Sequence, residues 1–275
     1  MVITLALNKS EVVSLVGISV ADLGEIGNVG PHNLLMLLKA YLDESRHSDG
    51  PKCVVAGWVG TLEQWAACEK EWLTKLKPRS SLHMNDLRWN SKRDRLKRLL
   101  EKMGPIPARH GLQRVAGGMK HQDYQEVVAG TIAERALSPY MGCVQLCLHA
   151  MLDTMSPRQH LHVYFEEQKE HAHHVGILHE AVFKERQMDH RLLGMTFLGK
   201  HESWCFQPAD YLAFHLSTKA IDEECDKAVL TRPINGPGMG WNYDRAKLKR
   251  DVDYLTKQLG GASLPRFGAS RKRKK

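Results

Sequence analysis

The order of apolar and polar positions becomes regular at residue 37 and predicts a succession of strands and helices. Two β-rich runs, over 37–45 and 52–60, are separated by a polar turn, which indicates an antiparallel pair. Helical spacing of apolar residues follows over 61–77, with Thr61 as the expected N-cap. The later segments predict strands over 112–121, 159–168 and 191–200, helices over 91–103, 123–136, 140–155, 173–188 and 245–259, and a helix within 202–222.

These elements predict an α/β protein with a central sheet and a helical C-terminal extension. Residues 1–35 contain many glycines and turn formers, and we expect them to form a poorly defined extension. The main domain is expected over 36–262, followed by a basic, disordered tail over 263–275. Met36 directly precedes the first strand and is a second candidate for the translation start beside Met1.

Composition narrows the class of protein. The chain of 275 residues is 43% hydrophobic and 25% charged, and no stretch approaches the roughly 20 apolar residues of a membrane span. Its six cysteines include no CxxC pair, which favours reduced, buried thiols in a cytoplasmic protein. Neither a GxGxxG nor a P-loop motif is present, so no motif indicates a nucleotide cofactor.

The net charge of +8 is concentrated in two places. The stretch 88–102 holds seven basic residues and two acids, and the C-terminal RKRKK adds five positive charges. Concentrated positive charge suits a polyanion, which makes nucleic acid a candidate partner. A solvated helix face followed by a disordered tail explains the same pattern equally well.

Acidic residues stand at the ends of two predicted strands. Asp43 and Glu44 close the first strand, and Glu166 and Glu167 close the strand over 159–168. Because side chains alternate along a strand, one acid of each pair can face a common site while the other faces away. Asp43 is the expected ligand of the first pair, and Glu44 is expected to face elsewhere unless the strand ends before it.

A third acid, Asp210, is expected near a helix start. Pro208 suits the first helical position, which would place Asp210 in the first turn, near the positive end of the helix dipole. Three converging carboxylates would repel one another, and raised pKa values or bound divalent cations would relieve that repulsion. Taken singly, each acid is better explained as a cap, a surface residue or an ion-pair partner. Their joint arrangement favours Mg²⁺ or Mn²⁺, which prefer oxygen ligands.

Four segments together resemble a known family. YLDES, LHMNDL, VYFEEQ and FQPADYLAF, in this order, are similar to the motifs of the prokaryotic domain-of-unknown-function 3800 (DUF3800) family, whose fold resembles ribonuclease H. The resemblance covers roughly residues 37–220 and implies a ribonuclease H-like mixed central sheet flanked by helices. Arg46 departs from the family pattern, which usually has glycine there. The motif positions correspond to Asp43, Glu44, His83, Glu166, Gln207 and Asp210.

The resemblance implies a metal-dependent nuclease. Two Mg²⁺ or Mn²⁺ ions would be bound by Asp43, Glu166 and Asp210, one to activate a water and one to stabilise the leaving oxygen. His83 or Asp86 would position that water or assist product departure. The catalytic set that the resemblance implies is Asp43, Glu44, His83, Glu166 and Asp210. The nucleic acid (RNA, DNA or a hybrid) would be held by basic residues of 88–102, among them Arg88, Arg93, Lys97 and Arg98.

Other functions remain open at this point. A catalytically silent nucleic-acid-binding or accessory protein of the same fold is the main alternative. A metal-dependent hydrolase of small phosphoesters is a third, and it would need a closed pocket, whereas a nuclease would need an open groove. The sequence also contains fifteen histidines, but without a cysteine pair or an HExxH motif they do not support a structural zinc site.

Overall fold

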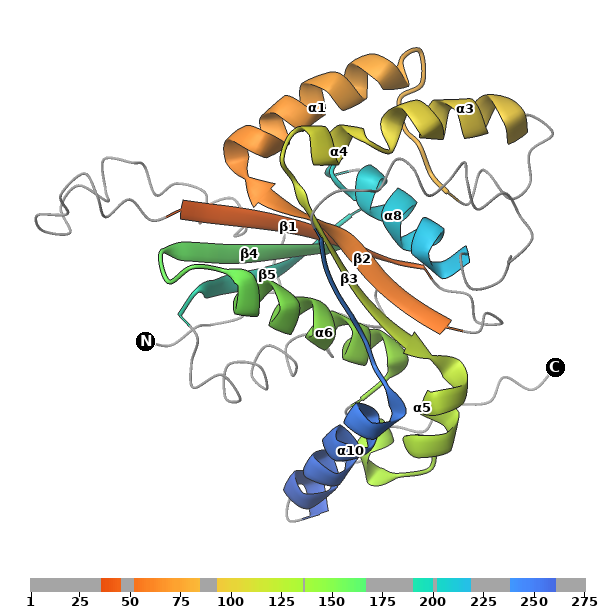
Figure 1. The fold of residues 1–275 in the computed structure, drawn as a ribbon, viewed down its shortest axis with the longest axis vertical. Coiled ribbons are helices and arrows are strands. Elements are labelled where there is room, and N and C mark those ends of the chain that lie inside the picture. The colour runs from red at the N-terminus through yellow and green to blue at the C-terminus, as the bar shows by residue number, and fades with distance from the viewer. Residues whose placement is uncertain are drawn as a thin grey trace, which may run out of the picture. The chain divides into compact units, whose positions relative to one another are not determined.

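A computed structural model describes residues 36–45, 52–84, 93–135, 137–166, 190–199, 202–218 and 238–260 (Figure 1). Its centre is a six-stranded sheet in the order β5-β4-β1-β2-β3-β6. The strands are β1 (Met36–Ser45), β2 (Lys52–Thr61), β3 (Gln113–Lys120), β4 (Gln159–Glu166), β5 (Leu192–Leu198) and β6 (Gly238–Asn242). Strands β1, β2 and β3 are antiparallel neighbours, whereas β4 runs parallel to β1, β5 to β4 and β6 to β3. The predicted α/β class with a mixed sheet is therefore confirmed.

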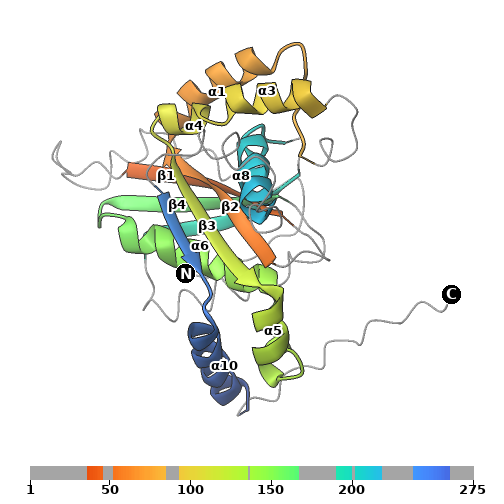
Figure 2. The ribbon, with the colours of Figure 1, turned by 45° about the vertical axis from the view of Figure 1, so that its right-hand side comes forward.

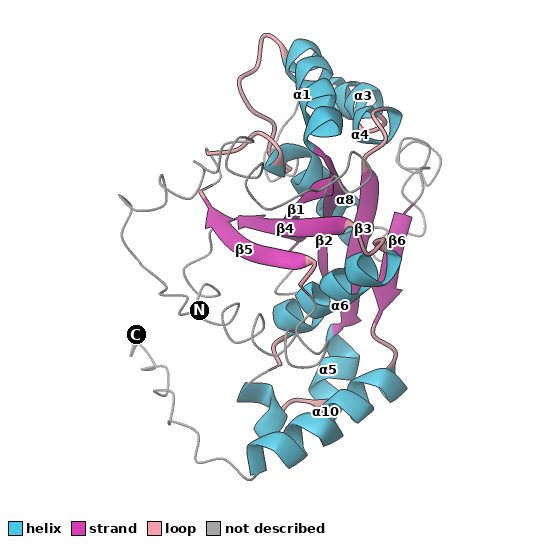
Figure 3. Ribbon diagram, turned by 90° about the vertical axis from the view of Figure 1, so that its left-hand side faces the viewer, coloured by secondary structure: helices cyan, strands magenta, loops and turns pink. Residues whose placement is uncertain are grey.

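Helices cover both faces of the sheet (Figures 1 and 2). Helices α1, α3, α4 and α8 belong to one face, and α6 packs on the other, against β2, β3 and β6. Helix α10 packs on α5 and on the 3₁₀ helix η2, near the lower end of the view in Figure 3. The bounds are α1 (Leu62–Leu76), α3 (Arg93–Met103), α4 (Ile106–Arg109), α5 (His121–Val127), η2 (Ile132–Arg135), α6 (Pro139–Thr154), α8 (Phe206–Thr218) and α10 (Arg245–Gly260).

Two hydrophobic clusters form the core, one on each face. Leu42 belongs to the cluster under α6, and its neighbour Tyr41 belongs to the cluster under α1 and α8. Three tryptophans of the second cluster, Trp58, Trp65 and Trp72, are almost completely buried. Because successive strand residues point to opposite faces, this division fixes the face of every residue in β1.

Local sequence signals explain several element boundaries. Thr61 caps α1 in a capping box with Gln64, as predicted from the sequence. Strand β3 forms despite its glycine pair, and Gly117 has a packing reason to be glycine. A Cβ atom at Gly117 would lie 2.3 Å from the carbonyl oxygen of Cys143 in α6, so only glycine lets the helix approach this closely.

The structure differs from the sequence prediction in two elements. The helix predicted over 123–136 is wrong, because the chain forms the shorter α5 and then η2, separated by Gly130 with a φ of +77°. Strand β6 was predicted as loop, and it is held by parallel pairing with β3. The helix predicted over 173–188 lies outside the described residues. No helix in the described ranges has the length and apolar character needed to cross a membrane.

Candidate functional site

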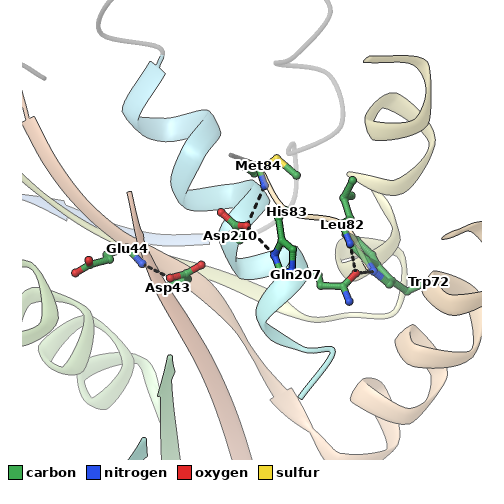
Figure 4. A network of polar contacts seen from close by, with 8 residues as sticks. All are labelled: Asp43, Glu44, Trp72, Leu82, His83, Met84, Gln207 and Asp210. Atoms are coloured by element: carbon green, nitrogen blue, oxygen red, sulfur yellow. Dashed lines mark hydrogen bonds and ion pairs between the residues drawn. The ribbon is translucent and has the colours of Figure 1, made fainter. Parts of the chain in front are cut away.

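The acids at the end of β1 point to opposite faces of the sheet. Strand β1 continues to Ser45, so Asp43 lies on the Tyr41 face and Glu44 on the Leu42 face. Figure 4 shows Asp43 extending toward α8 and Glu44 extending away from it. Asp43 is only 6% exposed, and its Oδ1 accepts a hydrogen bond from the Glu44 amide at 2.8 Å. Asp43 is therefore the acid of the pair that faces α8.

Glu166 lies on the same face as Asp43, on the neighbouring strand. In the parallel ladder of β1 and β4, Tyr41 pairs with Tyr164, and their rings stack with centroids 4.8 Å apart. Two residues further along each strand are Asp43 and Glu166, on the face of the two tyrosines. Neighbouring strands lie about 4.8 Å apart, so the two acids occupy adjacent backbone positions at one edge of the sheet.

Two contacts fix how α8 runs along β1. Trp58, the β2 partner of Tyr41, donates from Nε1 to the Pro208 carbonyl oxygen at 3.2 Å. Toward the other end of the helix, the Oγ atoms of Ser45 and Ser217 lie 2.7 Å apart. Helix α8 and strand β1 therefore run in the same direction across this face.

Asp43 and Asp210 both lie between those two contacts. With a rise of about 1.5 Å per helical residue, Asp210 is about 3 Å beyond Pro208. With about 3.3 Å per strand residue, Asp43 is about 7 Å beyond Tyr41. The backbones of the two acids are thus offset by about 4 Å along their shared direction, on facing elements.

Asp210 does not lie in the first helical turn, so that prediction is wrong. Helix α8 begins at Phe206, two residues before Pro208, and its first turn contains no acid. The Gln207 amide already donates to the carbonyl oxygen of Trp204 at 2.9 Å, which shows that the turn forms before the proline. Asp210 is in the second turn, where the helix dipole contributes less to its ionisation.

Helix α8 holds the segment 82–84 through two acceptors one turn apart (Figure 4). Gln207 Oε1 accepts from the indole Nε1 of Trp72 and from the Leu82 amide, each at 3.2 Å. Asp210 Oδ2 accepts from the Met84 amide at 3.1 Å. Leu82 and Met84 therefore both dock on the helix through their backbone amides.

His83 lies between these two anchored residues and next to Asp210. Its Nδ1 is 3.9 Å from Asp210 Oδ2, and the two side chains are 21% and 14% exposed. This is an ion pair when the imidazole is protonated. The structure thus brings together two residues that the sequence places more than 120 positions apart.

The surroundings of Asp43 are dry on the side of Tyr41. Burial raises the pKa of the Tyr41 phenol strongly, with the neighbouring Cys205 as the next cause. Burial likewise raises the pKa of the Cys205 thiol to about 12. Both groups are therefore neutral at physiological pH and supply no charge on this side of Asp43.

The acids share a face without forming a ready-made metal site. Within the described residues, no group of three or more His, Cys, Asp or Glu side chains is placed to hold a metal ion. Asp43, Glu166 and Asp210 are oxygen donors of the kind that Mg²⁺ and Mn²⁺ prefer. Their donor atoms and their shared face suit a divalent cation. To bind one, the three side chains would have to move closer together around it.

Several of the predicted nucleic-acid contacts lie outside what the structure describes. Asp86 and Arg88 fall in the gap between 84 and 93, and for Arg93 and Lys97 only the backbone of α3 is described. Arg98 is exposed and lines a pocket between the end of α1 and α3.

Lys102, which belongs to the basic stretch 88–102, also lines this pocket, together with two cations that were not singled out from the sequence, Lys77 and Arg79. Lys77 and Arg79 flank a proline just after a helix, so no periodic pattern indicates that they meet Lys102.

Comparison of the chain with protein-family models, with curated proteins and with solved structures finds no match in any of the three.

Proposed function

We propose that the protein is a metal-dependent nuclease that hydrolyses phosphodiester bonds at the Asp43–Glu166–Asp210 face. One observation carries this proposal. Asp43 and Glu166 occupy adjacent positions near the ends of two parallel strands, on the sheet face on which the Asp210-bearing helix α8 packs against β1 and β2. Carboxylates from three elements on one face are oxygen donors of the kind that a divalent cation binds.

Mg²⁺ or Mn²⁺ would be held by the carboxylates of Asp43, Glu166 and Asp210. Bound there, the cations supply an activated water and stabilise the leaving oxygen of the phosphodiester. Asp210 would serve this role while its Oδ2 also accepts a hydrogen bond from the Met84 amide. Glu44 faces α6 and has no part in the proposed site.

His83 handles the proton at this site. Its Nδ1 lies 3.9 Å from Asp210 Oδ2, at the proposed site. A protonated His83 can donate to the departing oxygen, and a neutral one can orient the attacking water. The two docked neighbours, Leu82 and Met84, hold its backbone in place for either role.

We also propose that the chain belongs to the DUF3800 family and has a ribonuclease H-like fold. The support is the order of its four motifs and a mixed sheet in which antiparallel strands are joined by parallel ones. The family's expected partner, nucleic acid, agrees with the basic stretch 88–102.

A catalytically silent nucleic-acid-binding protein is the second candidate, and a specific observation favours it. Asp210 already has a structural task, because it anchors the segment 82–84 through the Met84 amide. In addition, the described residues hold no preformed metal-ligand group. A protein that uses this fold only for binding would need Asp210 as an anchor and would not need a preformed metal site.

The decisive experiment compares Asp43→Asn with Glu44→Gln. The pair is matched, because both variants remove one carboxylate from adjacent residues on opposite faces. Labelled single-stranded, duplex and hybrid substrates are incubated with Mg²⁺, with Mn²⁺ and with EDTA. We expect cleavage by the wild type and Glu44→Gln, a loss of at least about 100-fold in Asp43→Asn, and none in EDTA.

Each other outcome has a definite meaning. Equal cleavage by all three proteins would indicate a contaminating nuclease and reject the proposal. Substrate binding without cleavage by the wild type would select the silent binding protein. An equal loss of cleavage in Asp43→Asn and Glu44→Gln would reject the proposal that Asp43, and not Glu44, belongs to the site.

A further inference from the structure

A basic pocket lies between the C-terminal end of α1 and helix α3, and the acidic site does not use it. Its volume is about 370 Å³. The described residues that line it include four cations and no acid: Leu76, Lys77, Pro78, Arg79, Arg98, Leu99 and Lys102. We call it the α1–α3 pocket.

Local structure explains why the cations gather there. Helix α1 ends at Leu76, whose carbonyl oxygen accepts from the Arg79 amide at 3.0 Å, so the chain turns sharply and exposes Lys77 and Arg79. On α3, Arg98 and Lys102 are four residues apart and therefore lie on the same side of the helix. The fully buried Leu76 forms an apolar floor below the exposed charges.

The electrostatics of the pocket select an anion. A cleft whose charged lining residues carry one sign concentrates counter-ions. The carbonyl end of α1 offsets only a fraction of one charge. A volume of 370 Å³ lies within the range of about 300–1,000 Å³ that small-molecule pockets span, so it accepts more than one phosphate group. A nucleotide unit has both the anion and the apolar body that the lining requires.

The pocket is connected to the acidic site by a short piece of chain. Arg79 at its rim is five residues from Met84, whose amide binds Asp210, and five extended residues span at most about 18 Å. Leu76 and Met84 also belong to the same hydrophobic cluster on the α8 face. At about 3.4 Å of axis per nucleotide, as in one strand of a duplex, 18 Å corresponds to at most about five nucleotides.

We propose that the α1–α3 pocket binds one nucleotide of the substrate strand, with its phosphate against Lys77, Arg79, Arg98 and Lys102. The strand then runs from this pocket to the acidic site, and the scissile bond lies within about five nucleotides of it. This inference rests on the proposed function for the identity of the ligand as a nucleic acid. Binding at the pocket is nevertheless measurable without any cleavage.

The test compares two double variants that each remove two exposed charges. Arg79→Ser/Arg98→Ser changes the pocket, and Lys249→Ser/Arg250→Ser changes α10, which packs on α5 and η2. Binding of a labelled 15-nucleotide single strand is measured by fluorescence anisotropy from 50 to 300 mM salt, in EDTA. We expect at least a tenfold loss of affinity for the pocket variant only, and a salt slope smaller by about 0.7 for each lost phosphate contact.

The remaining arms separate the outcomes. Arg79→Lys/Arg98→Lys should restore most of the affinity, and thermal melts should show that all variants fold, because the changed side chains are exposed. Asp43→Asn should bind the strand like the wild type, so loss of cleavage and loss of binding are distinguished. Equal affinity of the two serine variants would overturn the proposal. The proposal would also be overturned if AMP displaced the labelled strand at the same concentration as the unlabelled oligonucleotide does, since the ligand would then be a free nucleotide.

Discussion

The backbone amide of Met84 donates a hydrogen bond to Oδ2 of Asp210, 3.1 Å away. Together with the hydrogen bond from the Leu82 amide to Gln207, this bond fixes the segment 82–84 against α8. His83 is thereby held beside Asp210, with its Nδ1 3.9 Å from Asp210 Oδ2. The Asp210 carboxylate therefore both anchors the segment 82–84 and contributes to the proposed site. Substitutions can separate these two roles.

Asp210→Asn and Asp210→Ala should separate stability from activity. Asparagine keeps a carbonyl oxygen that can accept from the Met84 amide, whereas alanine leaves that amide without its partner. We expect Asp210→Ala to lower the free energy of unfolding by about 1–3 kcal/mol and Asp210→Asn by less than about 1 kcal/mol. Urea denaturation measures both values.

Cleavage should be lost in both variants, since both substitutions remove the negative charge. Loss of cleavage in Asp210→Asn with unchanged stability would assign the charge to the site. Unchanged cleavage in Asp210→Asn would show that Asp210 acts only as an anchor.

Gln207 is expected to contribute more to stability than Asp210. Its Oε1 accepts from two donors, the Trp72 indole and the Leu82 amide. Gln207→Ala would leave both without a partner in a buried region, at a cost of about 2–5 kcal/mol. Gln207→Glu keeps the acceptor and serves as the control in the same urea titration. A loss below about 1 kcal/mol in Gln207→Ala would show that water replaces the side chain.

Much of the fold could be predicted from the sequence, because strand alternation and helical periodicity are local properties. Alternation alone placed Asp43 and Glu44 on opposite faces, and the structure agrees. Strand β6 could not be predicted in this way. Its sequence GMGWN has little strand propensity, and it becomes a strand through pairing with β3, more than 100 residues earlier in the chain.

The arrangement of the candidate site could be predicted only in part. Its acids stand at strand ends, which the sequence shows, but the start of α8 depends on a turn at Trp204 that carries no strong capping signal. The pocket cations Lys77 and Arg79 meet Lys102 only because α1 and α3 pack together. Contacts between elements of this kind leave no periodic trace in the sequence.

In the Ser45–Ser217 pair, Ser45 should be the donor and Ser217 the acceptor of the hydrogen bond. Ser217 donates its hydroxyl hydrogen to the Phe214 carbonyl oxygen at 2.8 Å, so the hydrogen between the two serines belongs to Ser45. Ser217→Ala would leave the buried Ser45 hydroxyl without its acceptor and cost about 1–3 kcal/mol, whereas Ser45→Ala should cost about 0.5–1.5 kcal/mol. A double-mutant cycle by urea denaturation checks this, and strictly additive losses would contradict it.

The described cysteines should be unreactive in the native protein. All five are buried. Burial raises the pKa of Cys68 to about 12 and that of Cys143 well above its usual value, so very little thiolate exists at pH 8. We expect a Cys225→Ser variant, which lacks the sixth cysteine, to react with a thiol reagent only as fast as it unfolds. Rapid labelling of even one thiol in the absence of urea would contradict the burial.

His162 should make the protein less stable in mild acid. Its Nε2 is 2.8 Å from Thr196 Oγ1, and burial, followed by the nearby Lys39 charge, lowers the pKa of His162 below its usual 6.5. The unfolded chain then binds a proton at a higher pH than the folded chain does. Stability is therefore complete above about pH 7 and falls as the pH drops through 6.5 toward the folded pKa. Urea titrations at pH 7.5 and 5.5 should show a smaller loss for His162→Gln than for the wild type, because glutamine cannot be protonated. An equal loss in both proteins would assign the acid sensitivity to other groups.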